Sequence, residues 1–355
     1  MTYTTNKKRT FLRKNVTVFL GLLVLTGVTI FYINSKEDSY GEPVIMHFAQ
    51  GENNISCHYD QLGDALPSAE DPEFSPRPNS IFFHETSCSG GLNSRQACAV
   101  ESASRAHPRR QIYVLFSAPV SNYVLKRSNL AKLNKLPNVR LARVHIIDYA
   151  KKTPLEAMIA SAPFNQSKWR VEHTSDALRY LTLYKWGGVY LDTDMLVVKS
   201  LGTLGHNWVA KEDDGMINSA AIAISMDQLG RKLADAVVNE VKTTYRPDLW
   251  IHNGPGAITR VLNTLCQPAP IDQWSAKTCQ GLEVYNPEYI YPIHYTSKEI
   301  YFKTGTLNGV ENAYAHHFWN KLTFDMKIEK DSPYEQMAKI YCPTIYEMYG
   351  EQFGS

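Results

Sequence analysis

The possible fold is restricted most by one segment, TSDALRYLTLYKWGGVYLDTDMLVVKSL, in which a helix, an abrupt stop and a strand follow one another. Thr174 or Ser175 can cap the helix, and apolar side chains at helical spacing give it a buried face. Gly187-Gly188 ends the helix, because glycine readily takes the backbone conformation that closes a last turn. The apolar residues 189–191 then predict a short strand that enters a core.

The predicted strand ends at Asp192-Thr193-Asp194. Carboxylates at positions i and i+2 of a strand project to the same side, where they repel unless a cation lies between them. Hard cations such as Mg²⁺ or Mn²⁺ take carboxylate oxygens and often keep phosphate oxygens as further ligands. Most Asp-x-Asp pairs are solvated turns, but ligands of open α/β sheets bind at the carboxyl ends of strands. The pair therefore indicates a metal and diphosphate site.

Other parts of the chain repeat the alternation of strand and helix. Apolar runs at 81–83, 112–116 and 139–147 predict buried strands, and a helix is expected from Ser94 to about Arg105. Strands that alternate with helices indicate an α/β domain with a largely parallel sheet.

The N-terminus predicts a membrane anchor. Residues 1–15 carry five basic residues and no acidic one, and residues 16–33 form an uncharged apolar run. A short span with basic residues on one side predicts a single-pass type II protein of the Golgi membrane, with residues 1–15 cytoplasmic. A cleaved signal peptide is the alternative, but the apolar run is long for one and no small-residue cleavage site follows. Without the five basic residues the chain is slightly acidic, which excludes a basic nucleic-acid binder.

The rest of the chain predicts two further parts. Residues 34–78 are rich in proline and lack a persistent apolar period, which indicates a stem, and residues 79–355 are the predicted lumenal catalytic domain. Asn54 and Asn165 begin glycosylation acceptor tripeptides. The six cysteines favour disulfides in an oxidising lumen, and proximity in the chain suggests Cys266–Cys279.

Several blocks of the sequence closely resemble the α-1,4-glycosyltransferase family. They are residues 81–87, 97–103, 175–180, 186–194, 253–255 with 259–261, 291–293 and 317–320. The resemblance extends over about residues 79–347 and implies a GT-A type fold, a UDP-sugar donor, Mn²⁺, retention of anomeric configuration and a type II Golgi protein. It also implies α-1,4 transfer to the non-reducing end of a glycosphingolipid such as lactosylceramide.

The resemblance and the chemistry of the residue types together indicate a donor site. Donor contacts are expected from Asp176, Arg179, Tyr180, Asp192, Thr193, Asn218, Asn253, Gly254 and His317. Asp192, Asp194 and His317 are the expected metal ligands, because carboxylate and imidazole suit Mn²⁺. Asp192, Asp194 and Arg179 are the expected catalytic residues, with Arg179 and His317 supporting the departing diphosphate.

The spacing of these residues leaves simpler interpretations open. Asp176 and Arg179 lie one helical turn apart, so they can form a local ion pair or both face the sugar nucleotide. Asn218 and Asn253 carry amides that suit sugar hydroxyls, but asparagine is also an ordinary turn residue. His317 can ligate a metal or pack within an aromatic core.

One departure from the family pattern concerns the sugar. The chain reads His252-Asn253-Gly254-Pro255, whereas the vertebrate galactosyltransferase pattern has glutamine before the glycine. Galactose is favoured, and N-acetylgalactosamine or N-acetylglucosamine on a glycolipid or glycoprotein glycan is the alternative. An Asp-x-Asp phosphatase and an inactive lumenal UDP-sugar-binding protein are alternatives from other classes. A homo-oligomer is also possible.

Overall fold

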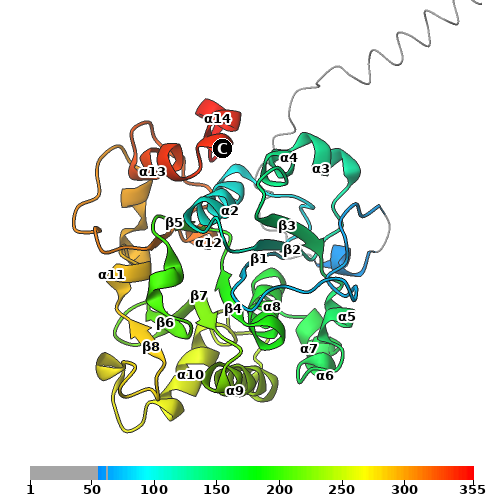
Figure 1. Cartoon of the computed structure of the whole chain (residues 1–355), viewed down its shortest axis with the longest axis vertical. Helices are drawn as coiled ribbons and strands as arrows, with labels where there is room; N and C mark the ends of the chain where they lie inside the picture. The colour runs from blue at the N-terminus through cyan, green and yellow to red at the C-terminus, as the bar shows by residue number, and fades with distance from the viewer. Residues whose placement is uncertain (1–54, 61–62) are drawn as a thin grey trace, which may run out of the picture. The chain divides into compact units, whose positions relative to one another are not determined.

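The computed structural model describes residues 55–60 and 63–355 (Figure 1). The predicted cytoplasmic tail, the predicted anchor at 16–33 and Asn54 lie outside the described residues. Within the described part of the chain, no helix combines the length and the apolar character needed to cross a membrane.

A seven-stranded sheet forms the centre of the domain, in the order β3-β2-β1-β4-β7-β6-β8. Its strands are β1 (Ile81–Glu85), β2 (Ile112–Phe116), β3 (Val139–Arg143), β4 (Gly188–Leu191), β6 (Trp208–Lys211), β7 (Ile217–Ile224) and β8 (Glu283–Tyr285). The first four in the order pair in parallel, β7 runs antiparallel to both its neighbours, and β8 pairs in parallel with β6. The predicted α/β class with a largely parallel sheet is confirmed, and the antiparallel strand β7 makes the sheet a mixed one.

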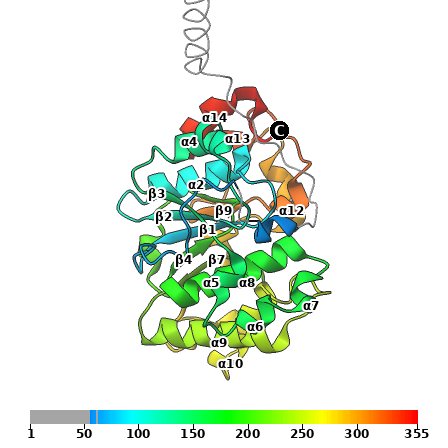
Figure 2. The same ribbon diagram turned by 90° about the vertical axis from the view of Figure 1, so that its right-hand side faces the viewer.

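Helices cover both faces of this sheet (Figure 2). On β1, Ile81 and Phe83 belong to the core on the side of α2 (Ser94–Ala106), whereas Phe82 belongs to the core on the side of α8 (Arg170–Trp186). This division follows from the alternation of side chains along a strand. The α8 side also holds α9 (Gln228–Thr244) and α10 (Pro255–Leu265).

Short elements complete the domain. The helices are α3 (Asn122–Arg127), α4 (Asn129–Leu133), α5 (Ile146–Ala150), α6 (Glu156–Ile159), α7 (Ala162–Asn165), α11 (Pro287–Ile290), α12 (Asn320–Thr323), α13 (Pro333–Tyr341) and α14 (Pro343–Tyr349). A separate two-stranded sheet pairs β5 (Met195–Val197) with β9 (Ala315–His317) in antiparallel fashion.

The predicted start of the long helix is wrong by several residues. Helix α8 begins at Arg170 and not near Thr174, which lies buried within it. The reason is tertiary: Ser167 accepts a hydrogen bond from the backbone of Trp169 and also bonds the carbonyl of Pro247. The predicted stop is confirmed, because Gly187 follows the last helical residue with a positive φ of 63°. Gly188 then begins β4 with a φ of 98°, and a Cβ there would lie 2.4 Å from the carbonyl oxygen of Ser80.

Two other boundaries also differ from the prediction. Asn93, not Ser94, caps α2, because Asn93 and Gln96 form reciprocal side-chain to backbone hydrogen bonds of 3.0 Å. The strand expected to reach residue 147 ends at Arg143, since β3 is only as long as the β2 strand that it pairs with.

Residues of the predicted stem that the structure describes contact the domain. Cys57 forms a disulfide with Cys88, and the buried Arg143 pairs with Asp64 at 3.0 Å. The other disulfides are Cys98–Cys342 and Cys266–Cys279, so the pairing suggested by proximity is confirmed. Asn165 ends α7, where its side chain accepts a hydrogen bond from the hydroxyl of Tyr59; its glycosylation stays a prediction.

Candidate functional site

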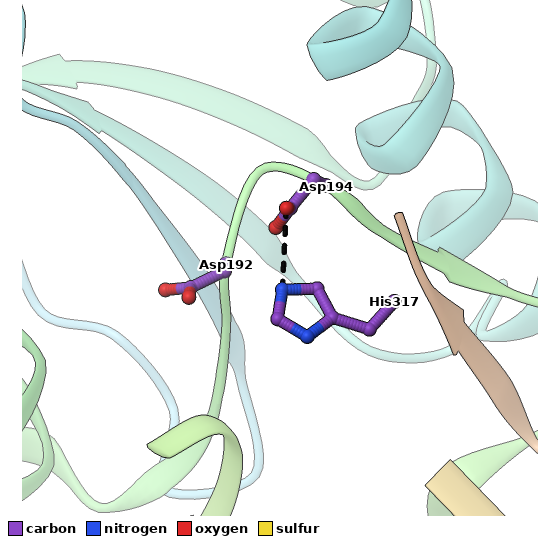
Figure 3. A group of neighbouring side chains, drawn as sticks. All are labelled: Asp192, Asp194 and His317. Carbon is purple, nitrogen blue, oxygen red and sulfur yellow. Dashed lines mark ion pairs between the residues drawn. The ribbon is translucent and has the colours of Figure 1, made fainter. Parts of the chain in front are cut away.

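The site lies at the carboxyl end of β4, where the parallel half of the sheet meets the antiparallel strand β7. The backbone of Asp192 donates to the carbonyl of Ala220, and a turn then brings Met195 into β5. Because Met195 pairs with His317 across β5 and β9, the C-terminal part of the chain places an imidazole beside this turn. Figure 3 shows His317 reaching from β9 toward the turn that carries the two aspartates.

Asp192, Asp194 and His317, here called the metal group, each offer a ligand atom, and these atoms lie within 4.8 Å of one another. Nε2 of His317 lies 3.2 Å from Oδ2 of Asp194, which also accepts a hydrogen bond of 2.7 Å from the backbone of Asn320. Two carboxylates and an imidazole match the donor set that Mn²⁺ accepts. The residues present therefore fit a divalent cation.

The electrostatics of the metal group couple His317 to Asp194. Burial alone lowers the pKa of a histidine, but the neighbouring Asp194 carboxylate outweighs burial and raises the pKa of His317. Burial conversely raises the pKa of Asp194, and the attraction of His317 overcomes it, so the pKa of Asp194 is lowered. Each residue of the pair therefore favours the charged form of the other.

A second charged cluster, here called the arginine group, consists of Asp176, Arg179 and Tyr190. Nη2 of Arg179 lies 3.1 Å from Oδ1 of Asp176 and 3.2 Å from Oδ1 of Asp192, and the Tyr190 hydroxyl donates to the same Asp192 oxygen at 2.5 Å. The ion pair left open by the helical spacing is thus present, and it extends to the metal group. Burial raises the pKa of Asp176 to about 7, although Arg179 opposes the rise.

The block that contains Gly254 packs directly against the arginine group. The Tyr180 hydroxyl donates to the carbonyl of Gly254 at 2.6 Å, and a Cβ at Gly254 would lie 2.2 Å from Oδ1 of Asp176. Only glycine fits there without moving the carboxylate. The structure places Tyr180 and Gly254 beside the arginine group, and their hydrogen bond joins α8 to the residue that precedes α10. Their contact with the donor stays a prediction.

Asn253 lies next to Gly254, but its amide is engaged by the chain itself. Its Oδ1 accepts from the backbone of Arg246 at 2.9 Å, and its Nδ2 donates to the carbonyl of Arg246 at 2.8 Å. The same Nδ2 lies 3.2 Å from Nε2 of His173. These contacts close the loop between α9 and α10.

Glu212 is a functional candidate that the sequence interpretation missed. It follows β6, is 8% exposed, and accepts a hydrogen bond of 2.7 Å from Nδ2 of Asn218 on β7. Burial raises the pKa of Glu212, whereas His317 opposes the rise. Asn218 also accepts from the backbone of Ala220 at 2.7 Å. An acidic residue directly after an apolar strand was the available signal.

Three further residues near the metal group have different surroundings. Thr193 accepts a weak hydrogen bond of 3.4 Å from Gln96 at the start of α2. His316 lies on the opposite side of β9 from His317, 3.0 Å from the Tyr301 hydroxyl, and burial lowers its pKa to about 4. Trp319, which was not predicted as a site residue, places its ring 4.0 Å from the His317 ring, centroid to centroid.

Two family models match the chain. Residues 93–213, which contain the metal-group aspartates, match the glycosyltransferase sugar-binding region containing the DXD motif. Residues 226–349, which contain Gly254 and His317, match the alpha 1,4-glycosyltransferase conserved region. The two matched regions thus supply both halves of the site.

Known proteins of similar sequence cover most of the chain. Lactosylceramide 4-alpha-galactosyltransferase of Mus musculus is 33% identical over 76% of this chain and 76% of its own length, and that of Homo sapiens is 30% identical over 78% and 79%. Alpha-1,4-N-acetylglucosaminyltransferase of Homo sapiens is 23% identical over 75% and 79%. Among solved structures, the galactosyltransferase LgtC with donor and acceptor sugar analogues aligns with a TM-score of 0.41 at 16% identity, covering 73% of this chain and 95% of that one.

Proposed function

Because this chain belongs to the α-1,4-glycosyltransferase family, we propose that it transfers galactose from UDP-galactose, in α-1,4 linkage and with retention, to the non-reducing end of a glycosphingolipid such as lactosylceramide. Family membership makes the chain a glycosyltransferase, and relatives at 30% identity or more are named for that donor sugar and acceptor. The observation that carries the proposal is the convergence of Asp192, Asp194 and His317 at the carboxyl edge of the sheet.

The metal group would hold Mn²⁺, since its donors are two carboxylates and an imidazole. When bound there, the ion supplies positive charge that offsets the charge developing on the UDP diphosphate as it departs. Nε2 of His317 and Oδ2 of Asp194 lie 3.2 Å apart, and the imidazole must be neutral to bind the ion. Asn320 fixes that Asp194 oxygen through its backbone amide.

Arg179 acts on the donor side of the site. Its guanidinium fixes Oδ1 of Asp192 and so keeps that carboxylate turned toward the donor. Because an arginine stays charged at every physiological pH, it also supplies a constant positive field near the diphosphate. Asp176 completes the ion pair from one helical turn earlier.

Glu212 and Asn218 belong to the sugar side of the proposed site. They lie on β7 and the turn before it, and the Glu212 carboxylate is close enough to His317 to interact with its charge. Sugar hydroxyls are recognised by carboxylates and amides, because both are strong hydrogen-bonding groups. These two residues are therefore proposed to orient the transferred sugar or the accepting hydroxyl.

The proposed topology is that of a type II protein of the Golgi membrane. It comprises a cytoplasmic tail at 1–15, an anchor at 16–33, a stem at 34–78 and a lumenal catalytic domain at 79–355. The three disulfides among the described residues support an oxidising compartment such as the lumen. Homo-oligomerisation stays a prediction.

The experiment that tests the function uses the full chain in detergent with Mn²⁺ and each of UDP-galactose, UDP-N-acetylgalactosamine and UDP-N-acetylglucosamine. The release of UDP is measured with and without lactosylceramide, and product linkage is determined by NMR. Release from UDP-galactose that depends on lactosylceramide is the expected result. Release from another donor would identify a different sugar, a possibility raised by Asn253 in place of glutamine. UDP binding without turnover of any donor would favour the inactive binding protein.

A further inference from the structure

A row of aromatic rings leads away from the metal group. The Trp319 ring packs against the His317 ring at a centroid distance of 4.0 Å, and the Tyr295 ring meets the Trp319 ring edge to face at 5.8 Å. The His294 ring lies 4.1 Å from the Tyr295 ring. We call His294, Tyr295 and Trp319 the aromatic row. It is in direct contact with the metal group through His317.

The aromatic row is buried at its inner end and exposed at its outer end. Trp319 is 7% exposed, whereas Tyr295 is 37% exposed. In the arginine group, by contrast, Asp176 and Arg179 are each 5% exposed. The outer end of the aromatic row can therefore contact an incoming substrate, whereas the arginine group is enclosed by the protein.

The chain holds the aromatic row in place. Trp319 has a φ of 56°, a left-handed conformation that costs free energy in a residue with a large side chain. Its Nε1 donates to the carbonyl of Ile293 at 3.1 Å, so the segment that carries His294 and Tyr295 is joined to the turn after β9. Such conformations persist where surrounding contacts fix them, and they gather at ligand sites.

His294 has an unused hydrogen-bond donor. The backbone of Thr296 donates to Nδ1 of His294 at 3.4 Å, and the Thr296 hydroxyl lies 2.8 Å from the same nitrogen. Because a backbone N–H can only donate, Nδ1 is the acceptor and the neutral ring carries its proton on Nε2. Nε2 is buried and forms no hydrogen bond with a described residue, since Oδ2 of Asp213 lies 3.9 Å away. Buried donors are nearly always paired in folded proteins, so Nε2 indicates a missing partner.

Glu212 supplies an acceptor next to this donor. Its carboxylate and the His294 ring offer atoms within 4.8 Å of each other, and its Oε2 accepts from Asn218. A sugar hydroxyl both accepts and donates, so it can bond a donor and an acceptor that lie side by side. The C–H face of a sugar ring can also pack on an exposed aromatic ring such as that of Tyr295. Since a carboxylate repels a phosphate and a protonated Nε2 has no lone pair for a metal ion, the combination favours a neutral sugar.

We propose that the aromatic row binds a sugar ring of the acceptor, with the ring against Tyr295 and one hydroxyl between Nε2 of His294 and Glu212. This inference rests on the proposed function and adds to it the residues that select the acceptor. The metal group is proposed to hold the donor through its diphosphate at the buried end of the site, so the exposed end is left for the acceptor. The aromatic row then orients the accepting hydroxyl toward the metal group.

Binding of a water-soluble β-lactoside to the full chain tests this subsite without any need for turnover. The protein is kept in detergent with Mn²⁺ and UDP, and the Kd of the lactoside is measured by isothermal titration calorimetry. Tyr295→Ala should raise this Kd about tenfold, whereas Tyr295→Phe, which keeps the ring, should stay within about twofold of the wild type. The Kd of UDP should be the same in both variants as in the wild type.

A second pair of variants tests the donor on Nε2. His294→Leu removes it, and His294→Gln places an amide donor on a side chain of similar length. The Kd of the lactoside should rise about tenfold in His294→Leu and recover in part in His294→Gln. The matched control is Ile300→Ala, because Ile300 is 46% exposed on the same short helix, Tyr295–Tyr301, but lies outside the aromatic row. It should bind the lactoside like the wild type.

Three results would overturn the proposal. They are no lactoside binding in the wild type, equal lactoside affinity in Tyr295→Ala and the wild type, and a second bound Mn²⁺ that is lost in His294→Leu. If the wild type transfers galactose to lactosylceramide and Tyr295→Ala binds the lactoside normally, the proposed function stands and the subsite fails. Lactoside binding that depends on Tyr295, without turnover of any donor, would refute the proposed function and support the subsite.

Discussion

The arginine group and the metal group both balance buried carboxylates with a cation, but the cations differ in permanence. Arg179 lies 3.1 and 3.2 Å from the two aspartates on either side of it, and its charge is independent of pH. His317 lies 3.2 Å from Asp194 and carries its charge only as long as it keeps a proton. A guanidinium cannot be exchanged for a metal ion, whereas an imidazolium that loses its proton becomes a ligand.

This difference separates a scaffold from an exchangeable site. The charges of the arginine group are balanced by residues of the chain itself. Arg179 and Tyr190 also hold Oδ1 of Asp192 in place. The metal group is complete only when a proton or a metal balances its carboxylates. The comparison predicts that changes in the arginine group lower stability as well as activity, whereas changes in the metal group mainly affect metal binding and activity.

The largest expected effect is that of Asp194→Asn. The substitution removes one carboxylate charge from the metal group, so sugar transfer should fall about a thousandfold while the melting temperature stays close to that of the wild type. UDP release and thermal unfolding measure the two quantities. Asp213→Asn is the matched control, because Asp213 caps an exposed turn and asparagine keeps the oxygen that accepts from Gly215. A large loss of sugar transfer in the control, or no loss in Asp194→Asn, would contradict the catalytic role of the metal group.

Arg179→Met tests the scaffold half of the comparison. It leaves the two aspartates without their cation, so the free energy of unfolding should fall by about 3 kcal/mol or more. Chemical denaturation at neutral pH measures this change. The partner variant Asp176→Asn should lose less, because Arg179 keeps Asp192. Arg179→Met with wild-type stability would show that the arginine group is not a scaffold.

His317→Gln should have the complementary effect. The variant loses a ligand but no permanent charge, so Mn²⁺ affinity should fall about ten- to a hundredfold, with activity partly restored by excess Mn²⁺. Titration of activity with Mn²⁺ measures this shift. His316→Gln is not a suitable control for stability, since His316 is buried; Lys321→Gln, exposed on α12, serves instead. Unchanged Mn²⁺ dependence in His317→Gln would remove His317 from the ligands.

Glu85 provides a third case, a buried carboxyl at the end of β1 that forms no ion pair with a described residue. Burial raises its pKa to about 7, and Ser87 opposes the rise by donating to Oε1. The folded protein therefore binds a proton that the unfolded chain releases above about pH 4.5, so this contribution to stability is present at low pH and is lost as pH rises through 7. Between about pH 5 and pH 7, the free energy of unfolding should fall by about 2 kcal/mol more in the wild type than in Glu85→Gln. Identical pH profiles in denaturation would contradict this.

Residues close in the sequence could be predicted, and those joined by tertiary contacts could not. The helix stop, β4 and the two metal-group aspartates follow from a continuous segment. His317 was predicted from its chemistry and the family resemblance, but its place depends on the pairing of β5 with β9, which no local pattern shows. The start of α8 was missed for the same reason, since Ser167 and Pro247 are far apart in the sequence though near in space. Glu212 was missed although it carries a local signal, because it directly follows an apolar strand.

The measurement that tests the central claim most directly is Mn²⁺ binding to the full chain, followed by the electron paramagnetic resonance signal of free Mn²⁺ with and without UDP. A site made by Asp192, Asp194 and His317 predicts binding that UDP strengthens, and a loss of about tenfold or more in affinity in Asp194→Asn but not in Asp213→Asn. Equal Mn²⁺ affinity in the wild type and Asp194→Asn, or UDP affinity that does not depend on Mn²⁺, would contradict the account.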